Sequence, residues 1–535
     1  MEKMDSPHSS ADQPLQPAPT VREHLSAFSL IFSALFLTHA ALLRLPYFWD
    51  EAGYYIPSAR DFLLTGDLIP HTTLSNVHPP LLMMYLAAWW KFSGFTPAVT
   101  RIAMLLVASF ALLGIWRLAS IVSNRTIAAA TVLCTAAYPV FFAQSTLAHL
   151  DMLAAALTLW GLAFYVERKF AWTIVLLALA AMAKETAVLT PIALFIWEIV
   201  CPWFRRQSFC YRERSWKHAF SLLLCGIPLA LWLAYHHHRT GYFLGNPEFL
   251  RYNLGATITP LRIVFAIGLR LWHSLGYMNL FVLTLLALAA MLEPALSYNG
   301  SPRRRIAIPV QLILAVVIGD HILALSVLGG AVLARYLLPV YPLIVLECVS
   351  TLHRRLRWWP VAIPVVVAAF VAGLLFNPPY RFAPEDNLTY RDYVLLHKQA
   401  ATYLAQHAHG ATVLTAWPAS DEISRPFLGY VKEPVPVVHI DNFAGSQMEL
   451  AAAAQGQYDW AYLFSTKYVP PRLLLHSAFW ERIEQRFFDD HTDLPPEVAA
   501  RMIGGRIVYR AQRRGEWVAL VQIERIENAK LQPLQ

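Results

Sequence analysis

The strongest constraint in this sequence is a series of apolar runs, each close to the twenty residues that a helix needs to cross a bilayer. Hydrophobic residues make up 57% of the 535 residues and charged residues only 15%, whereas soluble domains have roughly 45–50% and 25%. This balance predicts a polytopic all-α membrane protein and excludes a disordered chain or a disulfide-rich secreted scaffold. Eleven spans are predicted at residues 25–43, 99–121, 126–143, 149–166, 170–183, 186–203, 219–235, 275–292, 306–324, 332–351 and 359–376.

The basic residues indicate how these spans are oriented. Fifteen of them gather in alternate loops, and the positive-inside rule places such loops in the cytoplasm. They are Arg117, Arg125, Arg168, Lys169, Arg205, Arg206, Arg212, Arg214, Lys217, Arg303, Arg304, Arg305, Arg354, Arg355 and Arg357. With an odd number of spans, the amino terminus is then cytoplasmic and the carboxyl terminus lies outside. The net charge of +8 therefore reflects topology, and we expect no nucleic-acid partner.

Three domains are expected. Residues 1–24 are polar and Pro-rich, which predicts a disordered cytoplasmic tail. Residues 25–376 form the membrane domain, whose long outer segments are 44–98 and 236–274. The first of these carries two amphipathic helices, at 51–64 and 81–92, with many aromatic residues suited to the membrane interface. Residues 377–535 alternate helical patterns at 390–406 and 472–488 with short strand-like runs and a final hairpin, which predicts a soluble α/β domain outside the membrane.

Ionisable residues near the spans fall on the side opposite to the basic loops. They are Asp50, Glu51, His149, Asp151, Lys184, Glu185, Asp320, His321 and Arg335. Since charges are expensive in a membrane, their gathering at one side predicts a shared pocket. Carboxylates that face cations there suit an acid/base step on a phosphate-bearing substrate.

Each of these residues also has a structural alternative. Asp50 and Glu51 can cap the following helix, and Asp151 can serve as the first-turn acid of its span. Lys184 can be a snorkelling lysine, and a buried pair with Asp320 would satisfy Arg335. His78 can shape the turn at Pro79. A metal at His236–His238 is disfavoured, because three consecutive side chains do not face one ion.

The first outer loop also resembles a known family. In FWDEAGYYIPSARDFLLTGDLIPH and NVHPPLLMMYLAAWW, an Asp-Glu pair precedes a Tyr, a Gly-Asp dipeptide and a Pro-rich turn. This order is similar to that in the polyprenyl-phosphate-sugar-dependent GT-C glycosyltransferases, in the branch of the protein O-mannosyltransferases and the lipid A aminoarabinose transferases. Weaker matches follow at AHLDMLAAALTL, AMAKETAVLTP and ARYLLPVYPL, so that the resemblance covers about 350 residues.

The resemblance implies inverting transfer of a sugar from a lipid-phosphate donor on the outer face. Asp50 inherits the catalytic role, with Glu51 beside it. The aminoarabinose transferases carry a Lys-Pro where this chain has His78–Pro79, which leaves Lys184 and Arg335 as the candidates for binding the donor phosphate. The remaining substrate-binding candidates are Tyr54, His78, His149, Asp151 and Tyr336.

The sequence therefore predicts a glycosyltransferase of the bacterial inner membrane, with a polyprenyl-phosphate sugar donor and a glycan, lipid or protein acceptor. The sequence identifies no cofactor, and a requirement for a divalent cation stays open. One alternative is a transporter or flippase of lipid-linked envelope precursors, for which charged membrane residues are also expected. A second is an envelope scaffold that uses the spans only as an anchor.

Overall fold

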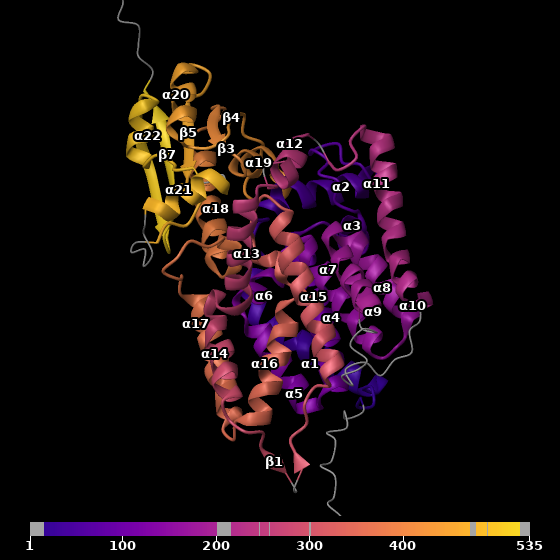
Figure 1. Ribbon diagram of the computed structural model, residues 1–535. Coiled ribbons are helices and arrows are strands. Elements are labelled where there is room, and N and C mark those ends of the chain that lie inside the picture. Colours follow the sequence, from indigo (N-terminus) through magenta and orange to yellow (C-terminus); the bar gives the residue numbers. More distant parts are fainter. Residues whose placement is uncertain are drawn as a thin grey trace, which may run out of the picture.

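In the computed structural model, a tall bundle of helices is covered at one end by a domain built from the C-terminal part of the chain (Figure 1). The structure describes residues 15–200, 216–245, 247–255, 257–298, 301–470, 478–488 and 491–524. We call the covered end the capped end. The predicted combination of an all-α membrane part and a C-terminal α/β part is confirmed.

A helix lies in each of the eleven predicted spans. In chain order these are α1 (Val21–His39), α4 (Pro97–Val122), α5 (Arg125–Ala137), α7 (Leu150–Val166), α8 (Phe170–Ala183), α9 (Leu189–Val200), α10 (Trp216–Leu223) with α11 (Ile227–Thr240), α14 (Leu280–Met291), α15 (Ile308–Val327), α16 (Tyr341–Arg355) and α17 (Trp359–Leu375). Within the described residues, five helical stretches are long and apolar enough to cross a membrane by themselves. The count of eleven spans stays a prediction.

Two predicted boundaries in the second half of the bundle are wrong. The segment at 236–274 was expected to lie outside the spans, but it contains α12 (Pro247–Leu250) and the apolar helix α13 (Pro260–Leu275). Helix α13 leads into α14 through a kink at which Met278 and Asn279 have left-handed backbones, with φ of 48° and 66°. The tenth span was predicted to begin at residue 332, yet its helix begins at Tyr341 because the chain around Arg335 forms a short 3-10 turn.

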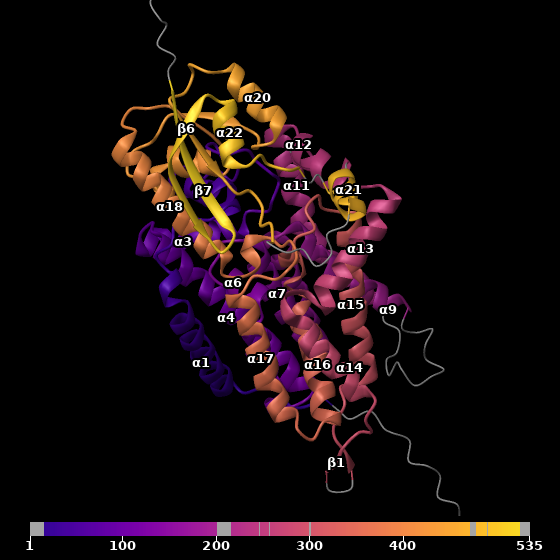
Figure 2. The same cartoon turned by 90° about the vertical axis from the view of Figure 1, so that its left-hand side faces the viewer.

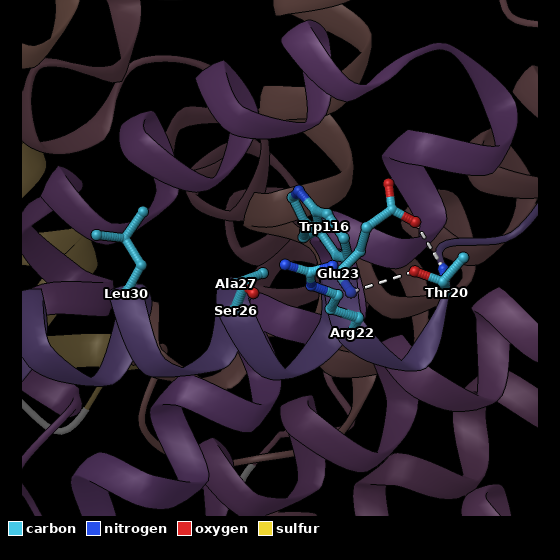
Figure 3. Close-up of a pocket in the computed structure, with 7 residues that line it drawn as sticks. All are labelled: Thr20, Arg22, Glu23, Ser26, Ala27, Leu30 and Trp116. Carbon is cyan, nitrogen blue, oxygen red and sulfur yellow. Dashed lines mark hydrogen bonds between the residues drawn. The ribbon is translucent and has the colours of Figure 1, made fainter.

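The disordered tail was predicted to extend to residue 24, but the described chain is helical from Val21. Thr20 and Glu23 form a capping box, in which each side chain accepts a hydrogen bond from the backbone N–H of the other (Figure 3). These two bonds satisfy backbone donors that the first turn leaves free, so the helix begins earlier than its apolar run. Residues 1–14 lie outside the described part, as do Arg205, Arg206, Arg212 and Arg214 of the third basic loop.

The first loop at the capped end contains the two predicted helices. The chain forms a π-helical turn at Glu51–Tyr55, then α2 (Ile56–Thr65) and α3 (Leu81–Ser93). Its aromatic residues were expected to sit in the membrane interface, but Tyr47, Phe48 and Trp90 are almost fully buried. Phe48 packs on Tyr390 and Tyr393 of the C-terminal domain, whereas Trp90 packs on Phe95 and donates to Thr100 of α4.

The C-terminal domain is built around a five-stranded mixed sheet of order β4-β3-β5-β7-β6 (Figure 2). The three N-terminal strands are parallel, and β6 and β7 form the predicted antiparallel hairpin. The strands are β3 (Val413–Ala416), β4 (Val437–Ile440), β5 (Trp460–Phe464), β6 (Gly505–Arg513) and β7 (Glu516–Ile523). The helices are α18 (Thr389–His407), α19 (Ala419–Ser424), α20 (Gly445–Ala453), α21 (Ala478–Phe487) and α22 (Pro496–Met502). Part of the helix predicted at 472–488 lies outside the described residues, because 471–477 are not described.

Close contacts fasten this domain to the first loop. The Trp417 indole packs so tightly on Gly53 that a Cβ at Gly53 would lie 2.6 Å from its ring nitrogen. Trp49 meets Trp417 edge to face at 5.4 Å, and the Tyr430 hydroxyl donates to the Tyr47 carbonyl at 2.9 Å. The loop that carries Asp50 is therefore held between the bundle and the domain.

Candidate functional site

Asp50 and Glu51 are neighbours in the chain, but their side chains enter different surroundings. The backbone of Trp49 is left-handed, with φ of 45°, and the π-helical turn begins directly after Asp50. Both features are uncommon for such residues and are concentrated at functional sites. The sharp turn directs Glu51 toward Arg101 of α4 and Asp50 toward Arg335.

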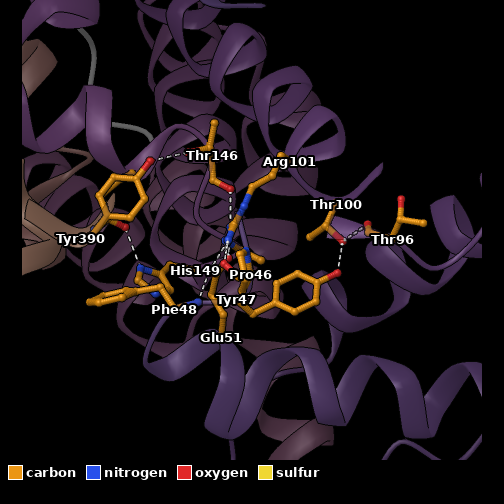
Figure 4. Close-up of polar contacts among 12 residues, drawn as sticks. Pro46, Tyr47, Phe48, Glu51, Thr96, Thr100, Arg101, Thr146, His149 and Tyr390 are labelled. Carbon is orange, nitrogen blue, oxygen red and sulfur yellow. Dashed lines mark hydrogen bonds and ion pairs between the residues drawn. The ribbon is translucent and has the colours of Figure 1, made fainter. Parts of the chain in front are cut away.

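Glu51 and Arg101 form a closed pair in the interior (Figure 4). Arg101 donates to both carboxylate oxygens of Glu51, with an Nη2–Oε2 distance of 2.9 Å, and also to the carbonyls of Pro46 and Thr146. The carboxylate in turn accepts from the backbone N–H groups of Phe48 and Ala148. Both side chains are almost inaccessible, at 0% and 1% exposed. This arrangement fits a structural brace and leaves Glu51 no lone pair directed at a substrate.

Asp50 belongs to a more open cluster around Arg335. The Arg335 guanidinium pairs with Asp50, lies 2.9 Å from a Glu385 oxygen and 3.6 Å from an Asp151 oxygen. The Asp151 carboxylate also accepts from Lys184 Nζ at 2.5 Å. We call these five residues, Asp50, Asp151, Lys184, Arg335 and Glu385, the Arg335 cluster. Asp50 is its most accessible carboxylate, with 18% of its side chain exposed against 4% for Asp151.

Three cations surround the ring of Tyr336. Lys184 Nζ lies 3.9 Å from the ring centroid, and the guanidinium carbons of Arg270 and Arg335 lie at 5.5 and 5.8 Å. Arg270 is fully buried, and only its Nη1 has a partner, the Leu333 carbonyl at 2.5 Å. Within the described residues, its Nε and Nη2 have no hydrogen-bond partner. A buried guanidinium with two unused donors is costly, and an anion is the ligand that would satisfy it.

Burial of Glu385 makes the Arg335 cluster more positively charged. Desolvation raises the pKa of Glu385 to about 8, although Arg335 opposes the shift. This shift favours the neutral form of Glu385, so that Glu385 offsets less of the positive charge of Lys184, Arg270 and Arg335.

Histidine and tyrosine residues line the neighbourhood of the cluster. His149 Nδ1 lies 3.0 Å from Arg335 Nη1, and the buried Tyr55 ring lies 5.9 Å from the His149 ring and 6.1 Å from the His78 ring. His78 pairs with Glu185 at 2.9 Å. Tyr54 lies apart from them, with its ring 5.8 Å from Trp417 of the C-terminal domain.

The structure also bears on the structural alternatives. Asp50 makes no capping hydrogen bond to the helix that follows it. Lys184 is only 7% exposed and points at Asp151, so it does not snorkel to solvent. Among the described residues, Arg335 pairs with Asp50, Asp151 and Glu385 and not with Asp320, so the suggested pair is wrong. Both interpretations apply to Asp151. It lies in the first turn of α7, and it also forms an ion pair with Lys184.

The suggested metal site at the three histidines has no counterpart in the described residues. His236 uses both ring nitrogens, one with the Ser75 hydroxyl at 2.7 Å and the other with the Tyr242 carbonyl at 3.0 Å. No group of three His, Cys, Asp or Glu residues is arranged to hold a metal ion within the described part of the chain.

Sequence reasoning missed three residues of this site. Arg270 interrupts an apolar helix just as Arg335 interrupts an apolar run, and the same criterion would have found it. Tyr55 directly follows Tyr54 and only the three-dimensional structure separates their roles. Glu385 lies between the last membrane helix and α18, where no local pattern indicates that it folds back onto Arg335.

Comparisons with known proteins agree with this geometry. Residues 77–235 match the family profile of dolichyl-phosphate-mannose-protein mannosyltransferases. This segment includes His78, His149, Asp151 and Lys184. A comparison with curated protein sequences finds no significant match.

The solved structures give a match over nearly the whole chain. The ArnT structure from Cupriavidus metallidurans in the apo state superposes with a TM-score of 0.53 at 14% identity, covering 93% of this chain and 98% of ArnT. The structure of the same protein bound to undecaprenyl phosphate gives a TM-score of 0.51 at 14% identity, covering 94% and 98%. The chain therefore has the fold of ArnT. Together with the family match, this fold confirms the predicted resemblance and the prediction of a multi-pass membrane glycosyltransferase, and it disfavours the transporter alternative.

Proposed function

We propose that this GT-C protein transfers a sugar from a polyprenyl-phosphate donor to an acceptor hydroxyl by a single inverting displacement. The observation that carries the proposal is the gathering of Lys184, Arg270 and Arg335 around Tyr336, next to the accessible carboxylate of Asp50. ArnT, whose fold this chain has, was crystallised with undecaprenyl phosphate, which is a ligand of the proposed class.

In this proposal the cations bind the donor phosphate. The donor is a phosphodiester whose phosphate gains negative charge as the glycosidic C–O bond breaks and the lipid phosphate monoester leaves, and preorganised cations stabilise that charge in the transition state. The two unused donors of Arg270 and the ammonium group of Lys184 are suited to this role. Arg335 links the phosphate side of the site to Asp50.

Asp50 is the proposed general base. The acceptor oxygen attacks the anomeric carbon, its proton passes to the Asp50 carboxylate, and polyprenyl phosphate leaves with the bonding electron pair. Glu51 has a different task, because its oxygens are fully used by Arg101 and by backbone N–H groups. We assign it to holding the loop that presents Asp50. Tyr54, His78, His149, Asp151 and Tyr336 are proposed to shape the substrate pocket around these groups.

The orientation is also part of the proposal. We infer that the capped end faces the outside of the bacterial inner membrane, because the fifteen basic residues of the alternate loops favour a cytoplasmic location for the opposite end. The membrane domain would then comprise residues 25–376 and the external domain 377–535. A single cysteine introduced at an exposed position of the C-terminal domain should react with a membrane-impermeant maleimide in intact spheroplasts.

The function is tested by mass spectrometry of envelope glycolipids, glycans and glycoproteins. Cells with the wild-type protein should contain a species heavier by one sugar residue than the corresponding species in cells that lack the protein. Cells that produce Asp50→Asn at equal level should lack that species. Identical envelopes in all three strains would overturn the proposed function.

A further inference from the structure

The turn that carries Asp50 has an unusual backbone. Trp49 is left-handed, with φ of 45°, and a π-helical turn at Glu51–Tyr55 follows directly after Asp50. A bulky residue rarely adopts such a conformation, and it persists only where the surrounding structure holds it. The groups that hold this turn therefore determine where the Asp50 carboxylate points.

The membrane domain supplies one set of these groups. Arg101 of α4 binds the Glu51 side chain and the Pro46 carbonyl (Figure 4), and the Thr73 hydroxyl donates to the Gly53 carbonyl at 2.7 Å. These contacts hold backbone and carboxylate groups of the turn. Its aromatic side chains have a second set of partners, which belongs to the C-terminal domain.

The C-terminal domain first holds the chain that leads into Trp49. The backbone N–H of Tyr47 donates to the Leu428 carbonyl at 3.3 Å, and the Tyr47 carbonyl accepts from the Tyr430 hydroxyl at 2.9 Å. Both backbone groups of Tyr47 are thus paired with this domain. The two bonds fix the direction in which the chain enters the turn.

Trp417 of the same domain packs on the turn itself. It directly follows β3, which pairs with β4 on one side and with β5 on the other. The ring centroids of Trp49 and Tyr54 lie 5.4 and 5.8 Å from that of Trp417. A Cβ at Gly53 would lie 2.6–2.9 Å from three atoms of the indole. Trp417 therefore contacts the chain on both sides of Asp50.

From this arrangement we propose that Trp417 is a positioning residue for Asp50, and that the C-terminal domain thereby completes the active site. With Trp49 and Gly53 both held against the indole, the turn keeps the shape that directs the Asp50 carboxylate to Arg335. Without the indole, the turn relaxes toward a more common backbone and Asp50 moves away from Arg335. The catalytic consequence rests on the proposed function, whereas the placement of Asp50 does not.

Placement is tested by chemical labelling, which needs no sugar transfer. A water-soluble carbodiimide couples an amine to carboxyl groups that solvent reaches, and peptide mass spectrometry measures the rate at Asp50 in the full-length protein in lipid nanodiscs. Trp417→Ala should raise this rate severalfold. Asp67 of the same loop is the internal reference, because its side chain is also 18% exposed and also pairs with an arginine. Its rate should not change.

Two further variants separate positioning from a loss of stability. Gly53→Ala leaves the C-terminal domain intact and should also raise the labelling of Asp50, because the new Cβ meets the indole. In the Trp417→Ala protein, where the indole is absent, Gly53→Ala should add little. Trp460→Ala removes a buried tryptophan of β5 in the same domain. It should destabilise the domain and leave Asp50 labelling at the wild-type rate.

The catalytic consequence is a lower kcat. Misplacing a catalytic group by about 1 Å costs on the order of 100-fold in rate, so Trp417→Ala should reduce kcat roughly 10- to 100-fold. Affinity for undecaprenyl phosphate should stay unchanged, because Lys184 and Arg270 remain beside Tyr336. In the Asp50→Asn background, Trp417→Ala should reduce kcat by less than about 2-fold, since the carboxylate that it misplaces is already gone.

The outcomes distinguish this inference from the proposed function. Labelling that responds as expected supports the placement of Asp50 by Trp417 even if Asp50→Asn transfers sugar normally, in which case the base assignment fails by itself. Wild-type labelling of Asp50 in both Trp417→Ala and Gly53→Ala would overturn the inference. So would an equal loss of kcat from Trp417→Ala with and without Asp50→Asn, because Trp417 would then act by another route.

Discussion

Two arginine–carboxylate pairs at the capped end differ in how completely they are satisfied. In the Glu51–Arg101 pair, each carboxylate oxygen and each terminal guanidinium nitrogen has a protein partner. In the Arg335 cluster, one guanidinium is shared among three carboxylates, and the neighbouring Arg270 keeps two unused donors. The first pair holds the loop in place, and the second leaves capacity for a ligand. Burial of a charge therefore does not identify a site, whereas incomplete pairing of a buried charge does.

The largest expected effect is on turnover, and it distinguishes Asp50 from Glu51. Asp50→Asn keeps the size of the side chain and removes its basicity, so turnover should fall about 10²–10⁴-fold. Thermal stability should fall less than in Arg101→Ala, because Asn can still accept a hydrogen bond from Arg335 and Asp50 is partly exposed. Turnover would be measured with purified protein and lipid-linked donor. Normal turnover of the variant would refute the base assignment.

The next effect is on the free energy of unfolding, which should depend on the Glu51–Arg101 pair more than on Asp50. Arg101→Ala leaves the Glu51 carboxylate buried without its partner, which should cost about 3–5 kcal/mol in the free energy of unfolding. Glu51→Gln should destabilise less, because the amide oxygen can still accept from a backbone N–H, and its turnover per folded molecule should exceed that of Asp50→Asn. Thermal unfolding in detergent would show both effects. A fully stable Arg101→Ala protein would contradict the brace.

A smaller effect is expected in donor binding. Lys184→Ala and Arg270→Ala each remove a cation beside Tyr336, and loss of a charged hydrogen bond corresponds to roughly 10- to 100-fold weaker binding of polyprenyl phosphate. Arg239→Ala is the control, because Arg239 is an exposed arginine whose partner is Asp67. Equal affinity in all three variants would remove both cations from the phosphate site.

The smallest effect concerns pH and the linker beside Glu385. Burial raises the pKa of Asp386 from an ordinary value of 3.8 to about 7, although a hydrogen bond from Tyr277 opposes the shift. The folded protein therefore holds this proton more tightly than the unfolded chain. Its stabilising contribution is fully present below about pH 4 and is lost as the pH rises through 7. Asp386→Asn should flatten the decline of unfolding temperature between pH 4 and 8, and an unchanged slope would count against a protonated Asp386.

The sequence alone determined a large part of this protein. Apolar runs place a helix in every predicted span, because a backbone in lipid has few alternatives to a helix. Short strand-like runs predicted the strands of the C-terminal domain and its final hairpin, which the structure places at 505–523, whereas the parallel pairing of β3, β4 and β5 was not predicted. The positions of Asp50, Asp151, Lys184 and Arg335 were found because charges interrupt or flank apolar runs, and the structure brings these four together.

Only the tertiary structure decided how those charges are paired. The sequence treats Asp50 and Glu51 as one motif, yet a left-handed residue and a π-helical turn send them to different arginines. Glu385 reaches Arg335 across 50 positions of sequence, and a bulge between Ile507 and Tyr509 changes the face of the sheet to which Tyr509 points. Such contacts depend on packing between distant segments. Local propensity and hydrophobic periodicity carry no information about them, because they describe each segment's own preference and not its neighbours in space.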